Sequence, residues 1–389
     1  MKTRVLIWCL ICFGASGSSS LYAQAFSFRG QAAAWANVNP GNDLPLWMGG
    51  RYIPQANLDL DLGEGRITGF EASANISGSA AMTLFDSLNT EGQLKAYRAW
   101  ARYATNQLEF RAGLQKINFG SASLLRPLMW FDQVDPRDPL QLTDGVWGML
   151  GRYYFLNNAN IWLWGLYGNI GPKTWETGPT TEKKPEYGGR LQLPLSRGEM
   201  AFSFHHRKAD QHFWGLCPPS EPCIGLPAFI TNIPENRYGF DVKMDVVVGL
   251  WLEASWINKR QAAGMFTNQQ MAVLGADYTL GIGNGLHLLA EQLVLSLDRE
   301  AFAFENTNHI TAGSVSYPLG LFDNISGMFF YDWTGKHLYS FAHWQRQFNR
   351  MSLFLMAFWN PEVFQLPQQT EQSGLFAGRG FQVMLVYNH

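Results

Sequence analysis

Alternation of apolar and polar side chains is the feature that most constrains the fold of this chain. In residues 55–62 the even positions are Ala, Leu, Leu and Leu, and the odd positions are Gln, Asn, Asp and Asp. Residues 237–245 repeat the pattern, with Tyr, Phe, Val and Met between Arg, Gly, Asp, Lys and Asp. A period of two places each set on one face of a β-strand. Such segments recur from Phe26 to the C-terminus, which indicates a transmembrane β-barrel with lipid outside and a wet lumen.

The N-terminus has the order of a secretory signal peptide. Two basic residues precede an apolar run from Val5 to Ala15, and small residues follow it. The apolar run is too short to span a bilayer as a helix. We therefore expect residues 1–23 to be a signal peptide, with cleavage after residue 23 or 25. Residues 24–389 are then expected to form a single outer-membrane barrel domain.

Composition limits the classes of function that this chain can have. It contains 29 Lys and Arg residues, two of them in the signal peptide, against 31 Asp and Glu residues. Nucleic-acid-binding proteins usually have a basic excess, so we do not expect nucleic acid as a partner. The 15 Trp, 14 Tyr and 27 Phe residues suit the aromatic girdles that a membrane barrel carries at both interfaces. Nothing in the sequence indicates a cofactor.

Two cysteines remain after removal of the signal peptide. They enclose a Pro-rich segment, Cys217-Pro-Pro-Ser-Glu-Pro-Cys223. In an exported protein this pattern favours a disulfide that closes a small loop. A metal site is the alternative, with the nearby His205, His206 and His212. The disulfide is our prediction, and no resident metal is expected.

The alternating segments predict eighteen strands joined by two kinds of connection. Tight turns such as residues 63–65 alternate with longer loops such as residues 39–51. Short turns of such barrels face the periplasm, so both termini are expected there. A sixteen-stranded barrel is the alternative, if two weak segments are miscounted. The expected strands are 26–38, 52–62, 66–76, 93–104, 107–116, 145–156, 159–168, 186–195, 198–208, 236–247, 249–260, 270–281, 285–297, 309–318, 325–334, 337–347, 350–359 and 379–388.

The same alternation predicts which polar side chains face the lumen. A charge on the lipid face at mid-membrane costs about 2–4 kcal/mol, so these residues must point inward. They either line an aqueous path and bias what passes, or satisfy one another and fill the interior. The set is Arg29, Gln31, Arg98, Trp100, Arg102, Glu109, Arg111, Gln115, Arg152, Arg190, Gln192, Glu199, His205, Arg207, Asp241, Lys243, Glu253, Asp277, His287, Glu291 and Asp332.

Residues 117–144 form the longest connection and the best candidate for a constriction. The segment from Leu124 to Phe131 is too apolar for a solvated loop. We expect it to fold into the barrel and pack on the wall, which brings its charged residues opposite wall arginines. An external lid that rigidifies the rim is the alternative. The predicted pore-lining residues are Arg98, Trp100, Arg102, Arg111, Arg126, Asp132, Asp135, Arg137 and Asp138.

This region also carries a resemblance to a known family. Residues 113–120 read Gly-Leu-Gln-Lys-Ile-Asn-Phe-Gly, Arg126-Pro127 and Asp-Pro-Arg-Asp at 135–138 follow, and Gly145-Val146 opens the next strand. The segment is similar to the strand and inward loop of Gram-negative outer-membrane porins, in particular the alginate-export and related eighteen-stranded porin families. The resemblance implies passive passage of an anionic or sugar-like solute. Acidic residues share the predicted lumen, so it implies no particular substrate.

The end of the chain gives a second resemblance. Phe381, Val383, Leu385 and Tyr387 form an alternating apolar stripe. It resembles the C-terminal assembly signal of outer-membrane barrels, which implies the barrel-assembly machinery as a partner. It departs from that signal because Asn388 and His389 follow the last aromatic residue.

The sequence therefore predicts a channel in the outer membrane of a Gram-negative bacterium. Small hydrophilic solutes, including saccharides or anions, would pass by diffusion. The alternative is a structural or assembly barrel with a plugged lumen, as part of a surface-polysaccharide or secretion complex. Catalysis is not expected, because no arrangement of nucleophile, base and orienting group can be specified around Ser203 and its neighbouring histidines. The solute and the oligomeric state are not defined by the sequence.

Overall fold

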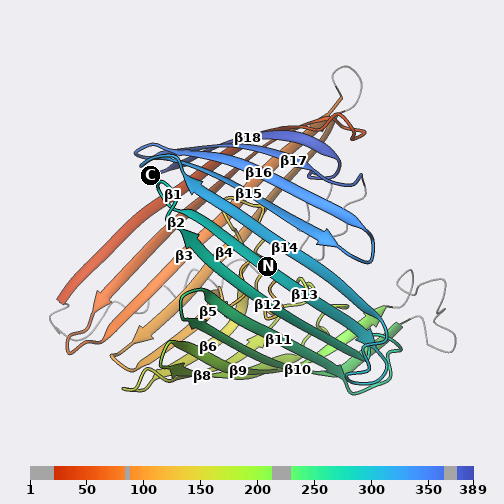
Figure 1. Cartoon of the computed structure of the whole chain (residues 1–389). Helices are drawn as coiled ribbons and strands as arrows, with labels where there is room; N and C mark the ends of the chain where they lie inside the picture. The colour runs from red at the N-terminus through yellow and green to blue at the C-terminus, as the bar shows by residue number, and fades with distance from the viewer. Residues whose placement is uncertain (1–21, 84–87, 213–228, 363–374) are drawn as a thin grey trace.

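The computed structural model describes residues 22–83, 88–212, 229–362 and 375–389. In these ranges the chain forms one antiparallel sheet of eighteen strands, each paired with its neighbours along the chain (Figure 1). The pairing of β1 with β18, from Gln31 opposite Asn388 to Val38 opposite Phe381, closes the sheet into a barrel. The predicted eighteen-stranded antiparallel barrel is confirmed, and the sixteen-stranded alternative is wrong.

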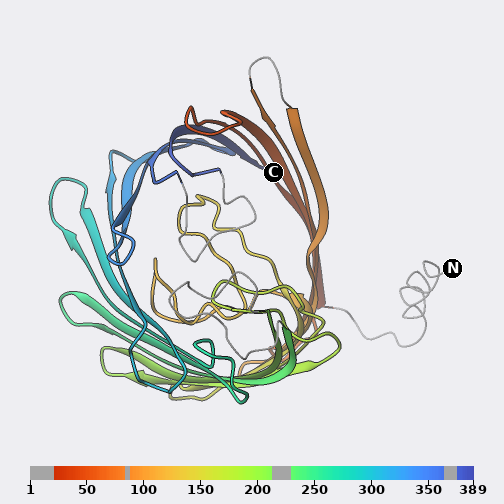
Figure 2. The ribbon, with the colours of Figure 1, turned by 90° about the vertical axis from the view of Figure 1, so that its right-hand side faces the viewer.

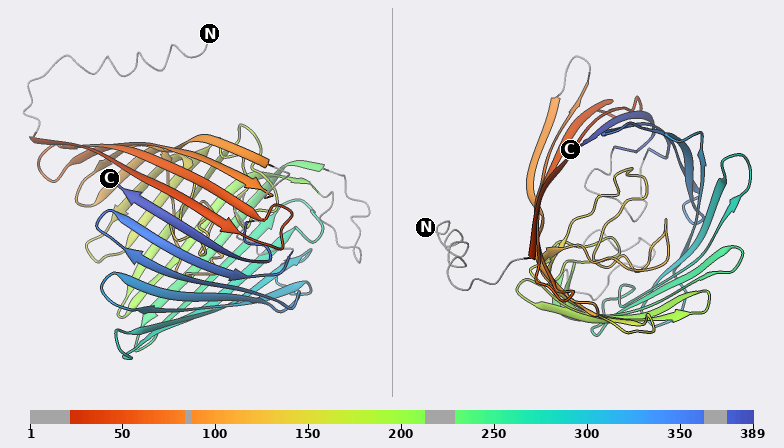
Figure 3. Two further views of the ribbon diagram at one scale, coloured as in Figure 1. Left: turned by 90° about the horizontal axis from the view of Figure 1, so that it is seen from above. Right: turned by 90° about the vertical axis from the view of Figure 1, so that its left-hand side faces the viewer.

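The strands run obliquely around the barrel, as two further views show (Figure 3). No helix in the described part of the chain is long and apolar enough to cross a membrane. The strands are β1 (Tyr22–Val38), β2 (Leu46–Asp61), β3 (Ile67–Met82), β4 (Leu88–Ala104), β5 (Leu108–Gln115), β6 (Val146–Tyr154), β7 (Asn160–Tyr167), β8 (Pro185–Leu195), β9 (Gly198–His212), β10 (Phe229–Asp245), β11 (Gly249–Lys259), β12 (Asn268–Leu280), β13 (Leu286–Asp298), β14 (Thr307–Pro318), β15 (Asp323–Asp332), β16 (His337–Gln347), β17 (Met351–Trp359) and β18 (Arg379–Asn388).

The connection between β2 and β3 shows how a tight turn reverses the chain. Gly63, Glu64 and Gly65 have φ angles of 76°, 54° and 73°. Glycine occupies this left-handed region without the steric cost that other residues meet. The carboxylate of Asp61 accepts a hydrogen bond from the backbone N–H of Gly63 at 2.8 Å. A strand cannot continue through three such residues, so β3 turns back and pairs antiparallel with β2.

Large apolar side chains point outward along the strands. Phe70, Leu274 and Phe381 are exposed, and the residues beside them in each strand face inward. This is the alternation on which the sequence prediction depended. An apolar outer surface of this kind is stable in lipid and not in water.

The inner face is polar on only part of the barrel. Inward positions of β2–β5 hold polar residues such as Asn57, Glu71 and Arg111. The prediction of a hydrophilic inner face throughout is wrong for β15–β18, because inward-folded chain segments pack there as on a hydrophobic core. The buried inward residues of these strands are Phe330, Tyr339, Phe341, Phe354, Met356, Phe358, Met384 and Val386.

Two predictions fall on parts of the chain that the structure does not describe. Residues 1–21 of the expected signal peptide lie outside the described residues, and so do Cys217 and Cys223. The signal peptide and the disulfide therefore stay predictions.

Candidate channel constriction

The loop between β5 and β6 enters the barrel, as the view along the barrel shows (Figure 2). We call residues 117–144 the constriction loop. Its apolar side chains are buried, and Trp130 donates a hydrogen bond to the hydroxyl of Ser255 on β11 at 3.2 Å. A β-carbon at Gly239 of β10 would lie 2.5 Å from Leu128, so a glycine lets the loop reach the wall. The predicted inward fold of this loop is confirmed, and the external lid is wrong.

Two carboxylates from the wall hold the first half of the constriction loop. Glu253 on β11 accepts hydrogen bonds from the backbone N–H groups of Ala122 and Leu128, at 2.9 and 2.6 Å. Glu291 on β13 accepts three more from residues 123–125, at 2.6, 3.0 and 2.6 Å. Buried N–H groups need partners, and these irregular residues lack a strand to supply them. Glu253 and Glu291, predicted only as lumen charges, therefore anchor the loop.

The second half of the constriction loop crosses the lumen and returns. Arg137 lies over the rings of Phe341 on β16 and of Phe376 in the β17–β18 loop, at 5.5 and 5.4 Å. On the return side, Arg98 of β4 donates to the carbonyl oxygen of Thr143 at 2.9 Å. Lys95 and Asp144 form an ion pair at 2.8 Å. The loop is thus fixed to the wall at three places around the barrel.

The charges of the constriction loop mostly neutralise one another. Asp132 pairs with Arg126 at 2.9 Å, and Asp135 pairs with Arg137 at 2.5 Å. All four side chains are buried. We expected them to face an open lumen; the structure brings them together in pairs, because a buried charge is costly without a partner.

Asp138 is the predicted acidic residue of the loop that stays partly exposed. Its carboxylate accepts hydrogen bonds from the backbone N–H groups of Leu140 and Leu142, at 3.0 and 3.4 Å. Burial raises the pKa of Asp138 above its ordinary value, and Asp135 adds to this effect. The two N–H groups and Arg51 oppose the rise without cancelling it.

The wall opposite the packed side carries three partly exposed arginines, Arg102, Arg111 and Arg152, which we call the arginine wall. Arg102 on β4 lies directly across from Arg111 on β5. Their side chains are 31% and 17% exposed, and that of Arg152 is 17% exposed, so solvent reaches each of them. The Nε group of each has no hydrogen-bond partner within the described residues. These Nε atoms are buried, so the exposed part of each side chain lies elsewhere on the guanidinium or on the aliphatic stem.

Aromatic rings and carboxylates hold the arginine wall in place. The guanidinium of Arg111 lies 4.7 Å from the ring centre of Trp100, and that of Arg152 lies 3.8 Å from the ring centre of Trp162. Such cation–π contacts orient a guanidinium without removing its charge. Glu109 pairs with Arg111 at 2.6 Å and lies 3.9 Å from Arg152. Of the predicted wall residues, Arg98 is the exception, because it is buried against the constriction loop.

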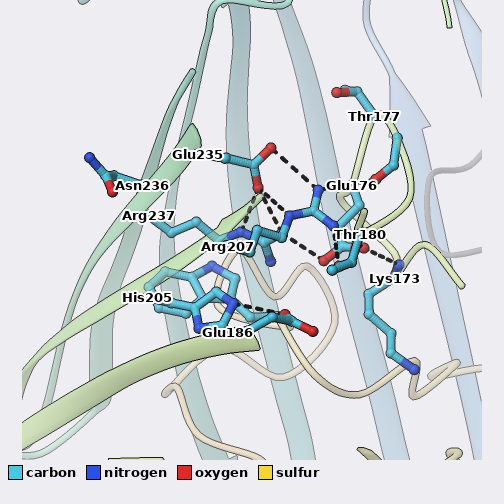
Figure 4. A network of polar contacts seen from close by, with 12 residues as sticks. Lys173, Glu176, Thr177, Thr180, Glu186, His205, Arg207, Glu235, Asn236 and Arg237 are labelled. Atoms are coloured by element: carbon cyan, nitrogen blue, oxygen red, sulfur yellow. Dashed lines mark hydrogen bonds and ion pairs between the residues drawn. The ribbon is translucent and has the colours of Figure 1, made fainter. Parts of the chain in front are cut away.

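Sequence reasoning missed a second inward segment. The strand pattern predicts residues 169–185 as one of the long outer loops, but Glu176 in this β7–β8 loop pairs with Arg207 of β9 and Arg237 of β10, at 2.9 and 2.6 Å (Figure 4). Glu235 of β10 pairs with the same two arginines at 2.6 and 2.8 Å. Burial alone would raise the pKa of Glu176, but the two arginines outweigh it and hold this pKa below its ordinary value. A tryptophan in this polar loop, Trp175, was the available signal.

Ser203 and the nearby His205 each have partners on other residues of the barrel. Ser203 accepts a hydrogen bond from Arg190 at 3.0 Å. His205 accepts one from the indole N–H of Trp164 at 3.1 Å, and its other nitrogen lies 3.2 Å from Glu186. No group of three or more His, Cys, Asp or Glu side chains suited to a metal ion occurs in the part of the chain that the structure describes.

Comparisons with known proteins give the fold and no more. No protein-family model matches the chain, and no curated protein matches it. OccD3 (OpdP) of Pseudomonas aeruginosa is similar in structure, with a TM-score of 0.59 and 10% identity over 96% of this chain and 93% of that chain. OccAB4 of Acinetobacter baumannii has a TM-score of 0.56 and 8% identity over 95% and 99%. The predicted fold, a closed antiparallel β-barrel of the kind found in these solved structures, is confirmed. The likeness to alginate-export families stays a prediction.

Proposed function

We propose that this barrel is a channel for passive diffusion of small hydrophilic solutes and that it favours anions, including acidic saccharides. The path runs between the constriction loop and the inward faces of β2–β6. A protein of this kind needs no cofactor, and its partners are the outer-membrane lipid and the solute.

The asymmetry of the lumen is the observation that carries this proposal. On one side the inward segments pack against parts of β6 and β7 and against β11–β18 and β1. On the other side the arginine wall and its neighbours remain partly exposed. A solute that crosses the barrel must therefore pass close to guanidinium groups.

The charge near this path favours anions. Arg98, Arg102, Arg111 and Arg152 lie near three carboxylates, those of Asp59, Glu71 and Glu109. The acidic residues of the constriction loop do not balance the remaining charge, because Asp132 and Asp135 have arginine partners and Asp138 lies near Arg51. A positive charge in a narrow, poorly hydrated passage lowers the energy of a passing anion and raises that of a cation.

A plugged structural barrel is the second candidate, and one observation favours it. Trp175 of the β7–β8 loop donates a hydrogen bond to the constriction loop at Arg126, at 2.7 Å. Phe376 of the β17–β18 loop packs edge-on against Phe341 and Phe358 of the wall. Three inward segments thus fill much of the lumen, which suits a barrel that anchors a complex.

Planar-bilayer recording separates the two candidates. Purified, folded wild-type protein should give stable conductance steps and a reversal potential that shows anion preference in a salt gradient. The double variant Arg102→Ala, Arg111→Ala should lose part of that preference. Arg346→Ala, at an outward and exposed position, is the matched control and should keep it. Absence of steps from folded protein would support the plugged barrel. Steps with unchanged selectivity in the double variant would refute the role of the arginine wall.

A further inference from the structure

The outward face of β8–β11 changes character in ordered steps towards its long-loop end. The strand register places the outward residues of neighbouring strands in rows. Successive rows are apolar, aromatic, polar and then basic. The rows are Phe202 with Phe240; Phe204, Tyr238 and Trp256; Tyr187, His206, Asn236 and Asn258; and Lys208, Pro234 and Arg260.

The aromatic row marks the level of the membrane interface. Tyr238 and Trp256 stack with ring centres 5.1 Å apart. The indole N–H of Trp256 donates a hydrogen bond to Asn268 at 3.2 Å, which is the polar contact that such residues make at an interface. Tyr and Trp gather where hydrocarbon meets the headgroups. The two rows beyond them therefore lie at headgroup level.

The polar row presents hydrogen-bonding groups at that level. His206 lies 2.7 Å from the side-chain oxygen of Asn236, on the neighbouring strand. Asn258 donates to Asn268 at 2.9 Å. Asn236 is buried, and His206 and Asn258 are only partly exposed, so these side chains form an ordered layer below the basic row.

The basic row consists of Lys208 on β9 and Arg260 just after β11. Pro234 of β10 lies between them, and neighbouring strands are about 4.8 Å apart, so the backbones of the two residues are about 10 Å from each other. Neither has an ion-pair partner within the described ranges. Asp210 is the acidic residue on the same face of β9; it accepts hydrogen bonds from Thr181 and from the N–H of Asn232, at 2.6 and 3.0 Å.

The sector formed by β2, β3 and β4 lacks such a row, and the outward Arg379 of β18 lies over the ring of Trp359. The outward residues near the long-loop ends of β2, β3 and β4 are uncharged: Met48, Gly50, Gly78, Ala80, Thr90 and Gly92. A general need for charge at the rim would place basic residues there as well. The basic row is therefore a local feature of β9–β11.

We propose that the basic row binds the phosphate of a phosphorylated glycolipid in the outer leaflet, with His206 and Asn236 beneath it. The long loops of such barrels face outside, so this row meets the outer leaflet. Cationic side chains at headgroup level attract anionic lipid, and a phosphate offers several oxygens to Lys and Arg at once. The acyl chains would lie over the apolar rows that contain Phe202 and Phe240. The site is independent of the channel function.

Native mass spectrometry of the folded barrel in detergent tests this proposal. Bis-phosphorylated lipid A should bind, and lipid A without phosphate should bind much more weakly. The double variant Lys208→Ala, Arg260→Ala should weaken binding by about tenfold or more, since each lost charged contact is worth about a factor of ten. Arg346→Ala, on the outward face at the short-turn end, is the matched control. Lys208→Arg should retain binding.

Three outcomes would overturn the proposal. The first is equal binding of lipid A with and without phosphate. The second is displacement of the lipid by inorganic phosphate at the concentration of the lipid, which would indicate a simple anion site. The third is equal binding of phosphatidylglycerol, which would indicate attraction to any anionic lipid. Heat-induced migration shifts on gels show independently that each variant is folded.

Discussion

The indole N–H of Trp175 donates a 2.7 Å hydrogen bond to the carbonyl oxygen of Arg126. This bond joins the β7–β8 loop to the constriction loop. The next residue, Glu176, is held by Arg207 and Arg237 of the wall. The constriction loop is therefore held by the β7–β8 loop and by Glu253 and Glu291 of the wall. Its shape depends on residues that never touch the solute path.

Removal of the Glu291 carboxylate should loosen the constriction. Three backbone N–H groups of residues 123–125 and the indole of Trp251 donate to it. Each buried donor left without a partner costs about 1–3 kcal/mol, so Glu291→Ala should lower the free energy of unfolding by about 3 kcal/mol or more. Urea unfolding in lipid vesicles measures this loss, and single-channel recording should show noisier or larger steps.

Glu305→Ala is the control for that experiment, because Glu305 is exposed in the β13–β14 loop. It should change neither quantity. Equal stability and equal conductance of the Glu291 variant would show that the loop keeps its position without this anchor.

Asp138 should make ion selectivity depend on pH. Burial raises its pKa, so the loop loses this negative charge at a higher pH than an ordinary Asp would allow. Selectivity should shift towards anions as the pH falls through the raised pKa. The folded state binds this proton more tightly than the unfolded state does. Ionisation of Asp138 therefore lowers the free energy of unfolding as the pH rises through the same range.

The variant Asp138→Asn checks both effects of this residue. Reversal potentials measured between about pH 7 and pH 4 should become less dependent on pH, and the variant should be more stable at neutral pH. Asp43→Asn, in the exposed β1–β2 loop, should retain the pH dependence of the wild type. An unchanged profile in Asp138→Asn would place the titrating group elsewhere.

Local patterns allowed the sequence to predict the strands and the inward loop. A period of two fixes the face of each residue, and the apolar segment from Leu124 to Phe131 has no stable place in water. The partners of Glu253, Glu291 and Glu176 could not be predicted in this way. Each one contacts a segment far away along the chain. Alternation predicts that a charged side chain points inward, but it does not predict the residue that the side chain contacts.

The inner apolar wall was missed for a related reason. Phe354, Met356 and Phe358 are inward on β17, yet Leu353, Leu355 and Ala357 between them are apolar too. A continuous apolar run carries no period, so it does not reveal that both faces are covered, one by lipid and one by protein.

Cys217 and Cys223 should form a disulfide. They lie outside the described residues, so the sequence alone supports this prediction. Closing so short a loop should stabilise the protein by about 2–3 kcal/mol at most on the chain-entropy estimate. The intact mass should be two units below that of the reduced form, and barrel assembly should survive Cys217→Ser. Quantitative alkylation of both thiols without reductant would contradict it.

His389 should contribute to barrel assembly. His389 occupies the outward position that follows Tyr387, and its backbone exchanges hydrogen bonds with Gly30 of β1 at 3.0 and 3.1 Å. Its ring stacks on Tyr52 with centres 5.9 Å apart, and the hydroxyl of Tyr52 lies 3.0 Å from its Nε2. An aromatic side chain thus extends the outward stripe beyond Tyr387.

His389→Ala should therefore slow folding into membranes and lower stability by about 1 kcal/mol, the value of one aromatic contact. His389→Phe should assemble at the wild-type rate, because it keeps the ring at the last outward position. Time courses of the heat-modifiable folded form, with and without the purified barrel-assembly complex, measure both variants. If the alanine variant folds as fast as the wild type in both conditions, the signal ends at Tyr387 and the last ring has no role. If the His389→Phe variant also folds slowly, the contact between the imidazole and Tyr52 is what stabilises the junction of β18, β1 and β2.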